Sequence, residues 1–494
     1  MLFQSPTKTK VWTPDPATPL GEWTDTRVST LKCLGANLVD DGVAWSQPEL
    51  GGDGFAELDR AIRKLEAYGQ RLCELREAGL SIQLAQALFR YAAVGGPQHI
   101  LMCRAVPAQS ADLFDARLRA VWERVLGISF SDDAWARATL PMKLGGIAPG
   151  AIAPRASAAY LSAAARTLPE VLRRTGLPSD GALRGVACAL DGRIKSAAAD
   201  LIARGVDEAE IPFAEGISLK APRQKDLVSK IHRVQCRDLM ALLADPGKAQ
   251  LRSASGTGAA AFLMLPTQQN HHVEDPLFQV AVVRRLGGRV TPKGGQQGAR
   301  CALVNSSGRC EACLDSTGVH ANQCKRGGHI VRRHDRIVKW LAGWIGERVD
   351  TETLVEQCPP GSEGGESRLD ITFESGGRRL WLDVAVVTVL TTSEPDVVRR
   401  ARLDGAAARQ EENSKKSKYK GLATPFVLES LGRPGDIARS IIGRFASDQG
   451  LGASADVAVA WQSLSAILQA ESAAHELRAC GYTPTDWASF VPSF

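Results

Sequence analysis

The sequence predicts a mixed protein of the α/β (α+β) class, and three observations support this prediction. Apolar residues recur every three or four positions through 54–135, which is the period of an amphipathic helix. Cysteines and a histidine crowd into 310–324, as in a metal site. Apolar and polar residues alternate over 369–375, and an apolar run follows at 380–390, as in paired strands.

Size, charge and composition set broad limits. The chain has 494 residues and 44% hydrophobic residues, enough for several domains with real cores. Its net charge of +6 is too weak by itself to indicate a nucleic-acid partner. The stretch 325–348, however, holds seven basic and two acidic residues, so most of the positive excess is concentrated there.

Cysteine usage and the first residues predict a soluble intracellular protein, nuclear or cytoplasmic. The 11 cysteines are odd in number and lack an extracellular spacing pattern, which favours a reducing compartment. The first segment, "MLFQSPTKTKVWTPD", lacks the apolar core of a signal peptide. No run approaches the roughly 20 apolar residues of a membrane span, so no membrane partner is expected. The oligomeric state stays open.

The first 300 residues are expected to be mainly helical. Short strands are expected before residue 45, and two amphipathic helices should end at Gly79 and Gly127. Further helices and two compact apolar segments, 256–266 and 275–287, lead to a glycine-rich linker.

The segment "RCEACLDSTGVHANQC" predicts a structural zinc site. Its spacing, C-x2-C-x6-H-x3-C, supplies the four ligands Cys310, Cys313, His320 and Cys324. Three nearby residues are alternative ligands or partners of ligands: Cys301, His329 and His334. So short a segment has little core, so metal binding would supply most of its folding energy. The competing interpretation is an ordinary loop that contains cysteines.

The basic segment after Cys324 is predicted to be a helix that contacts phosphate groups. The competing interpretation is a helix face that is merely solvated.

A carboxylate interrupts the most apolar predicted strand. "RLDITFE" and "LWLDVAVV" flank "SGGRR" and form a predicted hairpin, which brings Asp370 and Asp383 together. A buried carboxylate costs several kcal/mol unless a cation pairs with it. We therefore expect Mg²⁺ between the two aspartates. The alternatives are a strand-end position for Asp383 or an ion pair with Arg378 or Arg379.

A helix is predicted to begin at Ser393 and to run to Tyr419. It would present Lys415, Lys418 and Tyr419 to the metal, where a lysine could face the attacking water or the phosphate. The alternative is a solvated helix terminus. One more strand, "TPFVLES", and two helices complete the chain.

The order of these motifs resembles the carboxy-terminal half of the polyprotein of non-LTR retrotransposons that carry a restriction-enzyme-like endonuclease. "KTKVW" and "KCLGANL" resemble the end of the reverse-transcriptase palm, and "LPMKLGGIAP" resembles the segment after the thumb. "GTGAAAFLMLP" resembles the linker before the zinc knuckle. The motifs "CEACLDSTGVHANQC", "SRLDI", "WLDVAVV" and "KKSKY" resemble the knuckle and the PD-(D/E)XK-like nuclease core.

The resemblance implies five segments and a function. The segments are a palm remnant at 1–45, a helical thumb-like region at 46–200, a linker region at 201–300, a CCHC zinc knuckle at 301–330 and an endonuclease domain at 331–494. Asp370 and Asp383 would hold Mg²⁺, Lys415 or Lys418 would be the catalytic lysine, and Tyr419 would support it. This family nicks target DNA and extends the freed end on its own RNA, so DNA and element RNA are the implied partners.

Two departures from the family pattern bear on activity. Leu369 stands where the family usually has proline before the first aspartate. The polymerase aspartates would precede Met1, so no reverse transcription is expected from this chain alone. Two rival functions stay open: a catalytically inactive nucleic-acid-binding remnant of a retroelement, and a zinc-stapled scaffold.

Overall fold

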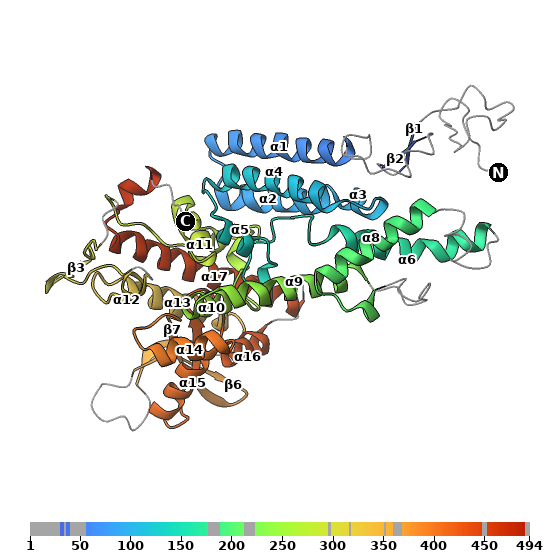
Figure 1. Ribbon diagram of the computed structural model, residues 1–494. Helices are drawn as coiled ribbons and strands as arrows, with labels where there is room; N and C mark the ends of the chain where they lie inside the picture. Colours follow the sequence, from blue (N-terminus) through green and yellow to red (C-terminus); the bar gives the residue numbers. More distant parts are fainter. Residues whose placement is uncertain are drawn as a thin grey trace. The chain divides into compact units, whose positions relative to one another are not determined.

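The structure is a computed structural model of the chain (Figure 1). It describes residues 30–33, 36–39, 56–175, 188–211, 223–294, 298–315, 318–349, 352–358, 368–446 and 452–489. The fold is mixed α/β, mostly helical with small sheets, as the sequence predicts. The segment "KTKVW" lies outside the described residues.

Two compact units interleave along the chain. Unit 1 comprises Met1–Arg71, Phe89–Trp122 and Pro149–Arg237, and unit 2 comprises Leu72–Leu88, Glu123–Ala148 and Asp238–Phe494. The five predicted segments instead follow one another in chain order, so they describe a different division of the chain and stay predictions.

Helices make up most of unit 1, and four of them extend into unit 2. A small hairpin of β1 (Thr30–Cys33) and β2 (Ala36–Val39) precedes them, as expected for this region. The helices that lie wholly or partly in unit 1 are α1 (Ala56–Glu77), α2 (Ile82–Gly95), α3 (Gln98–Cys103), α4 (Ala108–Leu126), α6 (Ala156–Thr175), α8 (Cys188–Ala203), η3 (Glu208–Glu210) and α9 (Gln224–Leu242).

Buried side chains of α6, α8 and α9 form one core of unit 1, with Leu161, Leu201 and Ile231 at its centre. The Trp122 indole N–H donates to the Pro149 carbonyl.

Unit 2 contains the Cys/His segment and the strands that carry the predicted site. Short helices come first: α5 (Asp132–Ala138), η2 (Met142–Leu144), α10 (Asp245–Ala254), η4 (Ala261–Leu263), η5 (Gln269–His271) and α11 (Asp275–Arg285). The Cys/His segment follows with β3 (Val304–Asn305), β4 (Gly308–Arg309), α12 (Val319–Gln323) and α13 (His329–Gly346). The chain closes with α14 (Glu394–Arg402), α15 (Ala406–Lys418), α16 (Asp436–Phe445), α17 (Ala453–Ala479) and η6 (Pro484–Ser489).

A four-stranded sheet in the order β5-β6-β7-β8 forms the centre of the carboxy-terminal part. Its strands are β5 (Leu354–Gln357), β6 (Leu369–Ser375), β7 (Arg378–Val387) and β8 (Thr424–Glu429). β6 and β7 form the predicted antiparallel hairpin, closed by Gly376 and Gly377, whose φ values of 61° and 69° suit a two-residue turn. β7 and β8 are parallel, and α14 and α15 connect them.

The apolar run in β7 follows from its central place in this sheet. Ile371, Phe373 and Leu382 lie in a core formed with α13, α16 and α17. Trp381 belongs to a second cluster, against which Tyr419 packs. A strand that contacts side chains on both faces reads as a continuous hydrophobic run, because neither face meets water.

The predicted single helix from Ser393 to Tyr419 is wrong, because the chain breaks it into α14 and α15. Leu403 is extended, with φ −123° and ψ 128°, and Gly405 has a φ of 67°, which favours glycine. Arg252 and Arg433 form ion pairs with Asp404 at this break. These arginines are distant in sequence and stabilise the break between α14 and α15, so local helix propensity does not predict it.

Arg285 ties three segments of unit 2 together from a buried position. Its guanidinium donates to the carbonyls of Met142 (2.6 Å), Gly146 (3.1 Å) and Ala259 (3.3 Å), and the residue is 2% exposed. Burial lowers its pKa to about 9. Without Arg285, these buried carbonyl groups would lack these hydrogen-bond donors.

We expect Arg285→Leu to lower the free energy of unfolding by about 3–5 kcal/mol, because it leaves buried carbonyls without a donor. Urea unfolding followed by circular dichroism measures this. The matched change at the exposed Arg289, Arg289→Leu, should cost less than about 0.5 kcal/mol. Equal effects of the two changes would contradict the role of Arg285.

No helix among the described residues combines the length and apolar character that a membrane crossing requires.

Candidate functional site

A short hairpin provides two cysteines on one face. The pairing of β3 with β4 continues outward, because the Cys310 N–H donates to the Leu303 carbonyl (2.8 Å) and the Cys301 N–H to the Ala312 carbonyl (2.9 Å). Side chains alternate between the two faces of paired strands. Cys301 and Cys310 therefore share a face, whereas Cys313 has the opposite parity.

Helix α12 provides the other two ligand candidates. It begins after Gly318, whose φ is 72°, and the Asp315 carboxylate accepts the N–H groups of Val319 (2.9 Å) and His320 (2.7 Å). The Cys324 N–H donates to the His320 carbonyl (2.9 Å) at the end of the helix. His320 and Cys324 are thus four residues apart, which places them on one face.

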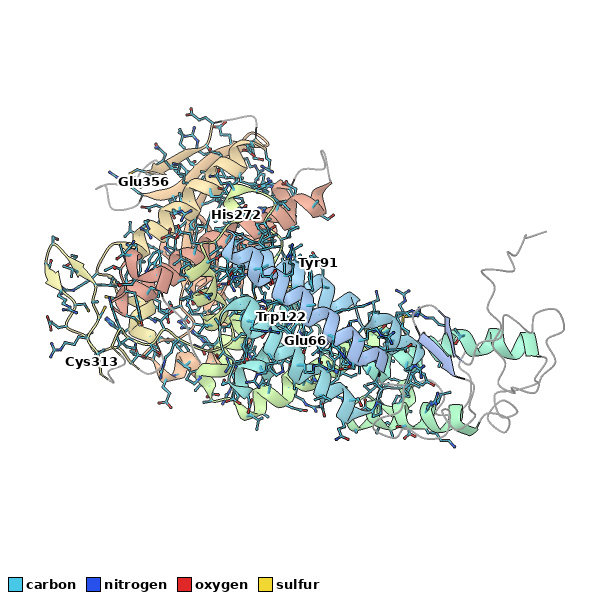
Figure 2. The ribbon with its side chains drawn as sticks, turned by 90° about the horizontal axis from the view of Figure 1, so that it is seen from above. Glu66, Tyr91, Trp122, His272, Cys313 and Glu356 are labelled. Carbon is cyan, nitrogen blue, oxygen red and sulfur yellow. The ribbon has the colours of Figure 1, made fainter. Side chains whose placement is uncertain are left out.

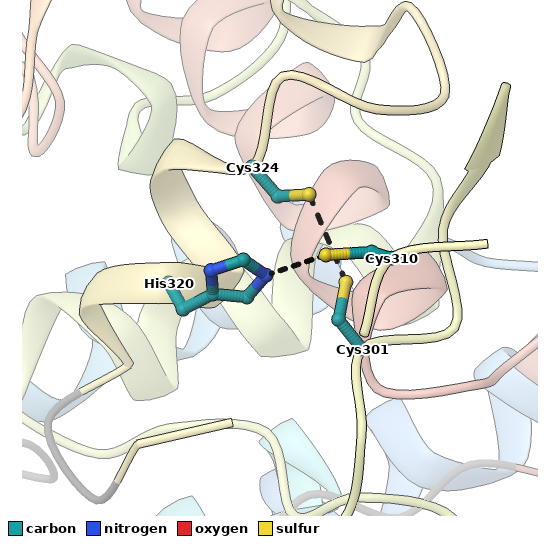
Figure 3. A group of neighbouring side chains, drawn as sticks. All are labelled: Cys301, Cys310, His320 and Cys324. Carbon is teal, nitrogen blue, oxygen red and sulfur yellow. Dashed lines mark hydrogen bonds between the residues drawn. The ribbon is translucent and has the colours of Figure 1, made fainter. Parts of the chain in front are cut away.

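The four side chains of Cys301, Cys310, His320 and Cys324 converge on one point (Figure 3), and their ligand atoms all lie within 4.8 Å of one another. The Sγ atoms of Cys301 and Cys324 are 3.8 Å apart, and the Cys310 Sγ is 3.3 Å from the His320 Nε2. Two sulfurs that each lie about 2.3 Å from a tetrahedral zinc ion would be about 3.8 Å apart. The spacing fits a zinc ion of S₃N type.

The structure corrects the predicted ligand set, because Cys301 takes the place of Cys313. Cys313 pairs with Arg300 across the hairpin, and its side chain is exposed (Figure 2). The prediction assumed that a C-x2-C pair closes a tight turn around the metal, but Cys310 and Cys313 lie on an extended segment and face opposite sides.

Two of the alternative ligands contact other groups. His329 is buried beside Arg478 and His475, and His334 contacts Asp370. Neither belongs to the Cys/His cluster.

Backbone N–H groups donate hydrogen bonds to the cysteine sulfurs of the cluster. The N–H groups of Leu303, Ala312 and Arg326, each two residues after a cysteine, donate to the sulfurs of Cys301, Cys310 and Cys324. Burial raises the pKa of Cys301 to about 12 and also raises the pKa of Cys324. Three thiols held together in this way can hold a metal that displaces their protons.

Cys301→Ser should abolish stoichiometric zinc binding, whereas Cys313→Ser should retain about one zinc ion per chain, because only Cys301 faces the other ligands. Metal analysis of the purified proteins measures this. If Cys301→Ser retains zinc and Cys313→Ser loses it, the ligands are those of the predicted C-x2-C arrangement, with Cys313 in place of Cys301.

The two aspartates of the predicted second metal site lie at the same end of the β6–β7 hairpin. The ladder ends at the pair of Ile371 with Leu382, and Asp370 and Asp383 are the next residue on each strand. In place of a ladder bond, the Val384 N–H donates to the Oδ2 atom of Asp370 (2.6 Å). The Asp370 side chain therefore contacts the backbone of β7 one residue after Asp383.

Asp383 is 4% exposed and is held by α15 and its carboxyl end. The Lys415 Nζ lies 2.7 Å from its Oδ2, and the Tyr419 hydroxyl donates to its Oδ1 (3.0 Å). Lys418 donates to the Tyr419 hydroxyl (3.0 Å). Asp383 therefore pairs with Lys415, and the expected alternative partner Arg379 instead contacts Glu374.

Two buried glutamates fix the position of α15. The Glu429 carboxylate, at the end of β8, accepts the Ala408 N–H (3.2 Å) near the start of the helix. Glu412, within α15, accepts the Ile437 N–H (3.1 Å) at the start of α16. Burial raises the pKa of both glutamates. These contacts set the rotation of α15, which directs Lys415 toward the sheet.

His334 is the residue near this site that the sequence does not assign to it. Its Nε2 lies 3.3 Å from the Oδ2 of Asp370, and its Nδ1 lies 3.2 Å from the Oδ1 of Asp335. The hydrogen bond to Asp370 raises the pKa of His334 to about 9, although burial opposes the shift. The sequence predicts His334 only as an alternative ligand, or a partner of a ligand, at the zinc site, and nothing in its spacing points to Asp370.

Most of the predicted phosphate-binding arginines contact acids of α17. Arg332 and Arg336 pair with Glu471 at 2.7 and 2.5 Å, and Arg348 pairs with Asp456 at 2.8 Å. Arg333 is buried and donates to the Ser472 hydroxyl. Arg326 instead donates to the Gly308 and Arg309 carbonyls, and Lys325 and Lys339 are exposed without an ion pair to the described residues.

No known protein-family model matches this chain, and no curated protein matches it.

The ion pair of His334 with Asp370 predicts a pH-dependent stability. A histidine whose pKa is raised on folding stabilises the folded state fully at pH values below its ordinary pKa of 6.5. This stabilisation is lost as the pH rises through about 9. The loss of stability in His334→Ala, measured by urea unfolding without added Mg²⁺, should shrink by about 1–2 kcal/mol over this range. If His334→Ala loses the same stability at pH values below 6.5 and above 9, the ion pair is excluded.

Proposed function

We propose that this chain is a retroelement-derived, metal-dependent DNA endonuclease whose Cys/His cluster holds a structural zinc ion. The observation that carries the proposal is the buried Asp383, which lies at the same end of the β6–β7 hairpin as Asp370 and contacts Lys415 and Tyr419. Two aspartates, a lysine and a tyrosine in this order also resemble the motif of the nucleases of non-LTR retrotransposons, which supports the proposal.

The residues present fit a divalent cation. Mg²⁺ binds proteins through one or two carboxylates and keeps several waters. Asp370 uses its Oδ2 for Val384 and His334, and its Oδ1 accepts no hydrogen bond from the described residues. When bound, Mg²⁺ would lower the pKa of a water and reduce the negative charge of a phosphodiester. We assign Asp370 and Asp383 as its ligands.

Lys415 supplies a positive charge rather than a base. Burial lowers its pKa, but the ion pair with Asp383 more than offsets this, so the pKa lies above the ordinary value. A protonated ammonium group can stabilise the negative charge that develops on a phosphate during cleavage. Lys418 instead contacts Tyr419, so Lys415 is the better candidate for the catalytic lysine.

Exposed lysines at the end of α15 offer contacts to the nucleic-acid backbone. Lys416, Lys418 and Lys420 are exposed, and Lys418 donates to Tyr419, which contacts Asp383. Lys325 and Lys339 are exposed elsewhere in the same unit. Lysines bind phosphates as point charges, which gives affinity that falls steeply with salt. We propose target DNA and element RNA as the partners.

A second function is favoured by the same ion pair. Lys415 already compensates the charge of Asp383 at 2.7 Å, so the carboxylate is tolerated in the sheet without a metal. A chain that binds nucleic acid through its lysines but no longer cleaves would keep this arrangement.

Purified protein should nick supercoiled plasmid DNA in the presence of Mg²⁺, and Asp383→Asn should reduce the rate by about a hundredfold or more. Agarose gels resolve supercoiled from nicked DNA. Glu374→Gln changes an exposed acid on the same hairpin and serves as the matched control with an unchanged rate.

The outcomes separate the three functions. Nicking that persists in Asp383→Asn would show that this carboxylate is not catalytic. Salt-sensitive DNA binding without nicking by the unsubstituted protein would favour the inactive remnant. Absence of salt-sensitive binding would favour the zinc-stapled scaffold.

A further inference from the structure

His334 contacts the Asp370 carboxylate from α13, a helix with one buried face. It lies on α13, three residues before Ile337 and four before Val338, both of which are buried against the sheet. Residues at this spacing share a helix face, so the packing of the helix carries His334 to the strand.

Both ring nitrogens of His334 contact carboxylates. The Nδ1 lies 3.2 Å from the Oδ1 of Asp335, and the Nε2 lies 3.3 Å from the Oδ2 of Asp370. A partner at one nitrogen sets the orientation of the ring and therefore the direction of the other nitrogen. Asp335 thus orients the imidazole that contacts Asp370.

The contacts of Asp370 are all on one oxygen. Its Oδ2 accepts the Val384 N–H at 2.6 Å and faces the His334 Nε2, while its Oδ1 accepts no hydrogen bond from the described part of the chain. Two donors on one oxygen restrict rotation of the carboxyl group. The other oxygen is left for a cation.

Resting on the proposed function, we propose that His334 is a positioning residue, whose imidazole fixes the Asp370 carboxyl group so that its Oδ1 binds the divalent cation. Asp383 differs from Asp370, because Tyr419 donates to its Oδ1 and Lys415 contacts its Oδ2. Outer partners of this kind typically change metal affinity by about 10- to 100-fold when removed. His334 itself touches neither the metal nor the substrate.

The alternative to this positioning role is that His334 and Asp370 form an ion pair that only stabilises the fold. Removal of a structural ion pair lowers stability but leaves the affinity for metal unchanged once the protein is folded. Replacement of His334 by glutamine separates an effect of orientation from an effect of charge. The amide N–H of glutamine can occupy the place of the Nε2 without carrying a charge.

The experiment measures Mn²⁺ binding by isothermal titration calorimetry on zinc-loaded full-length protein, together with the melting temperature of each variant. His334→Ala should bind Mn²⁺ at least about tenfold more weakly, and His334→Gln should recover most of the affinity. His272→Ala, at an exposed histidine of the same unit (Figure 2), is the matched control and should leave the affinity unchanged.

Each outcome supports or overturns a distinct claim. If the unsubstituted protein binds no Mn²⁺, or Asp383→Asn binds it equally well, the proposed function fails. If Asp383→Asn abolishes binding but His334→Ala, folded at the assay temperature, retains full affinity, only the positioning role is overturned. Weak binding by His334→Gln as well as His334→Ala would show that charge, not orientation, is what His334 contributes, and would also overturn the positioning role.

Discussion

The ion pair between Asp383 and Lys415 is the interaction on which the carboxy-terminal architecture depends. A carboxylate inside a central strand costs several kcal/mol unless a cation pairs with it, and Lys415 of α15 supplies that charge beside β7. That helix, α15, is fixed at both neighbouring elements by Glu429 and Glu412. The break at Leu403–Gly405 allows α15 to take this direction independently of α14.

The Cys/His cluster is coupled to the same strand through α12. Gln323 lies between His320 and Cys324, and its amide donates to the Thr388 hydroxyl (2.8 Å) and to the Leu390 carbonyl just beyond β7. Val319, at the start of α12, packs against Val389, Leu390 and Ala407. A helix of five residues has little stability of its own, so a metal bound by the Cys/His cluster would join α12 to the hairpin and stabilise this contact with the sheet.

Sequence patterns were informative where a local rule decides the structure. The hairpin of β6 and β7 follows from alternation and a Gly-Gly turn, and three of the four predicted zinc ligands, Cys310, His320 and Cys324, converge as expected. The fourth ligand depends on the strand register, which places Cys301 rather than Cys313 on the inner face. The contact of His334 with Asp370 and the pairing of Arg332 with Glu471 join residues far apart in the sequence, and no local rule predicts them.

Anomalous scattering from crystals grown with Mn²⁺ and measured at its absorption edge would locate a divalent ion bound between Asp370 and Asp383. We expect one strong peak at the open end of the β6–β7 hairpin, bound by the Oδ1 of Asp370 and by a carboxylate oxygen of Asp383. The distances should be about 2.0–2.3 Å, as for other small divalent ions with oxygen ligands. A peak bound by only one of these aspartates, or no peak there at all, would contradict this expectation.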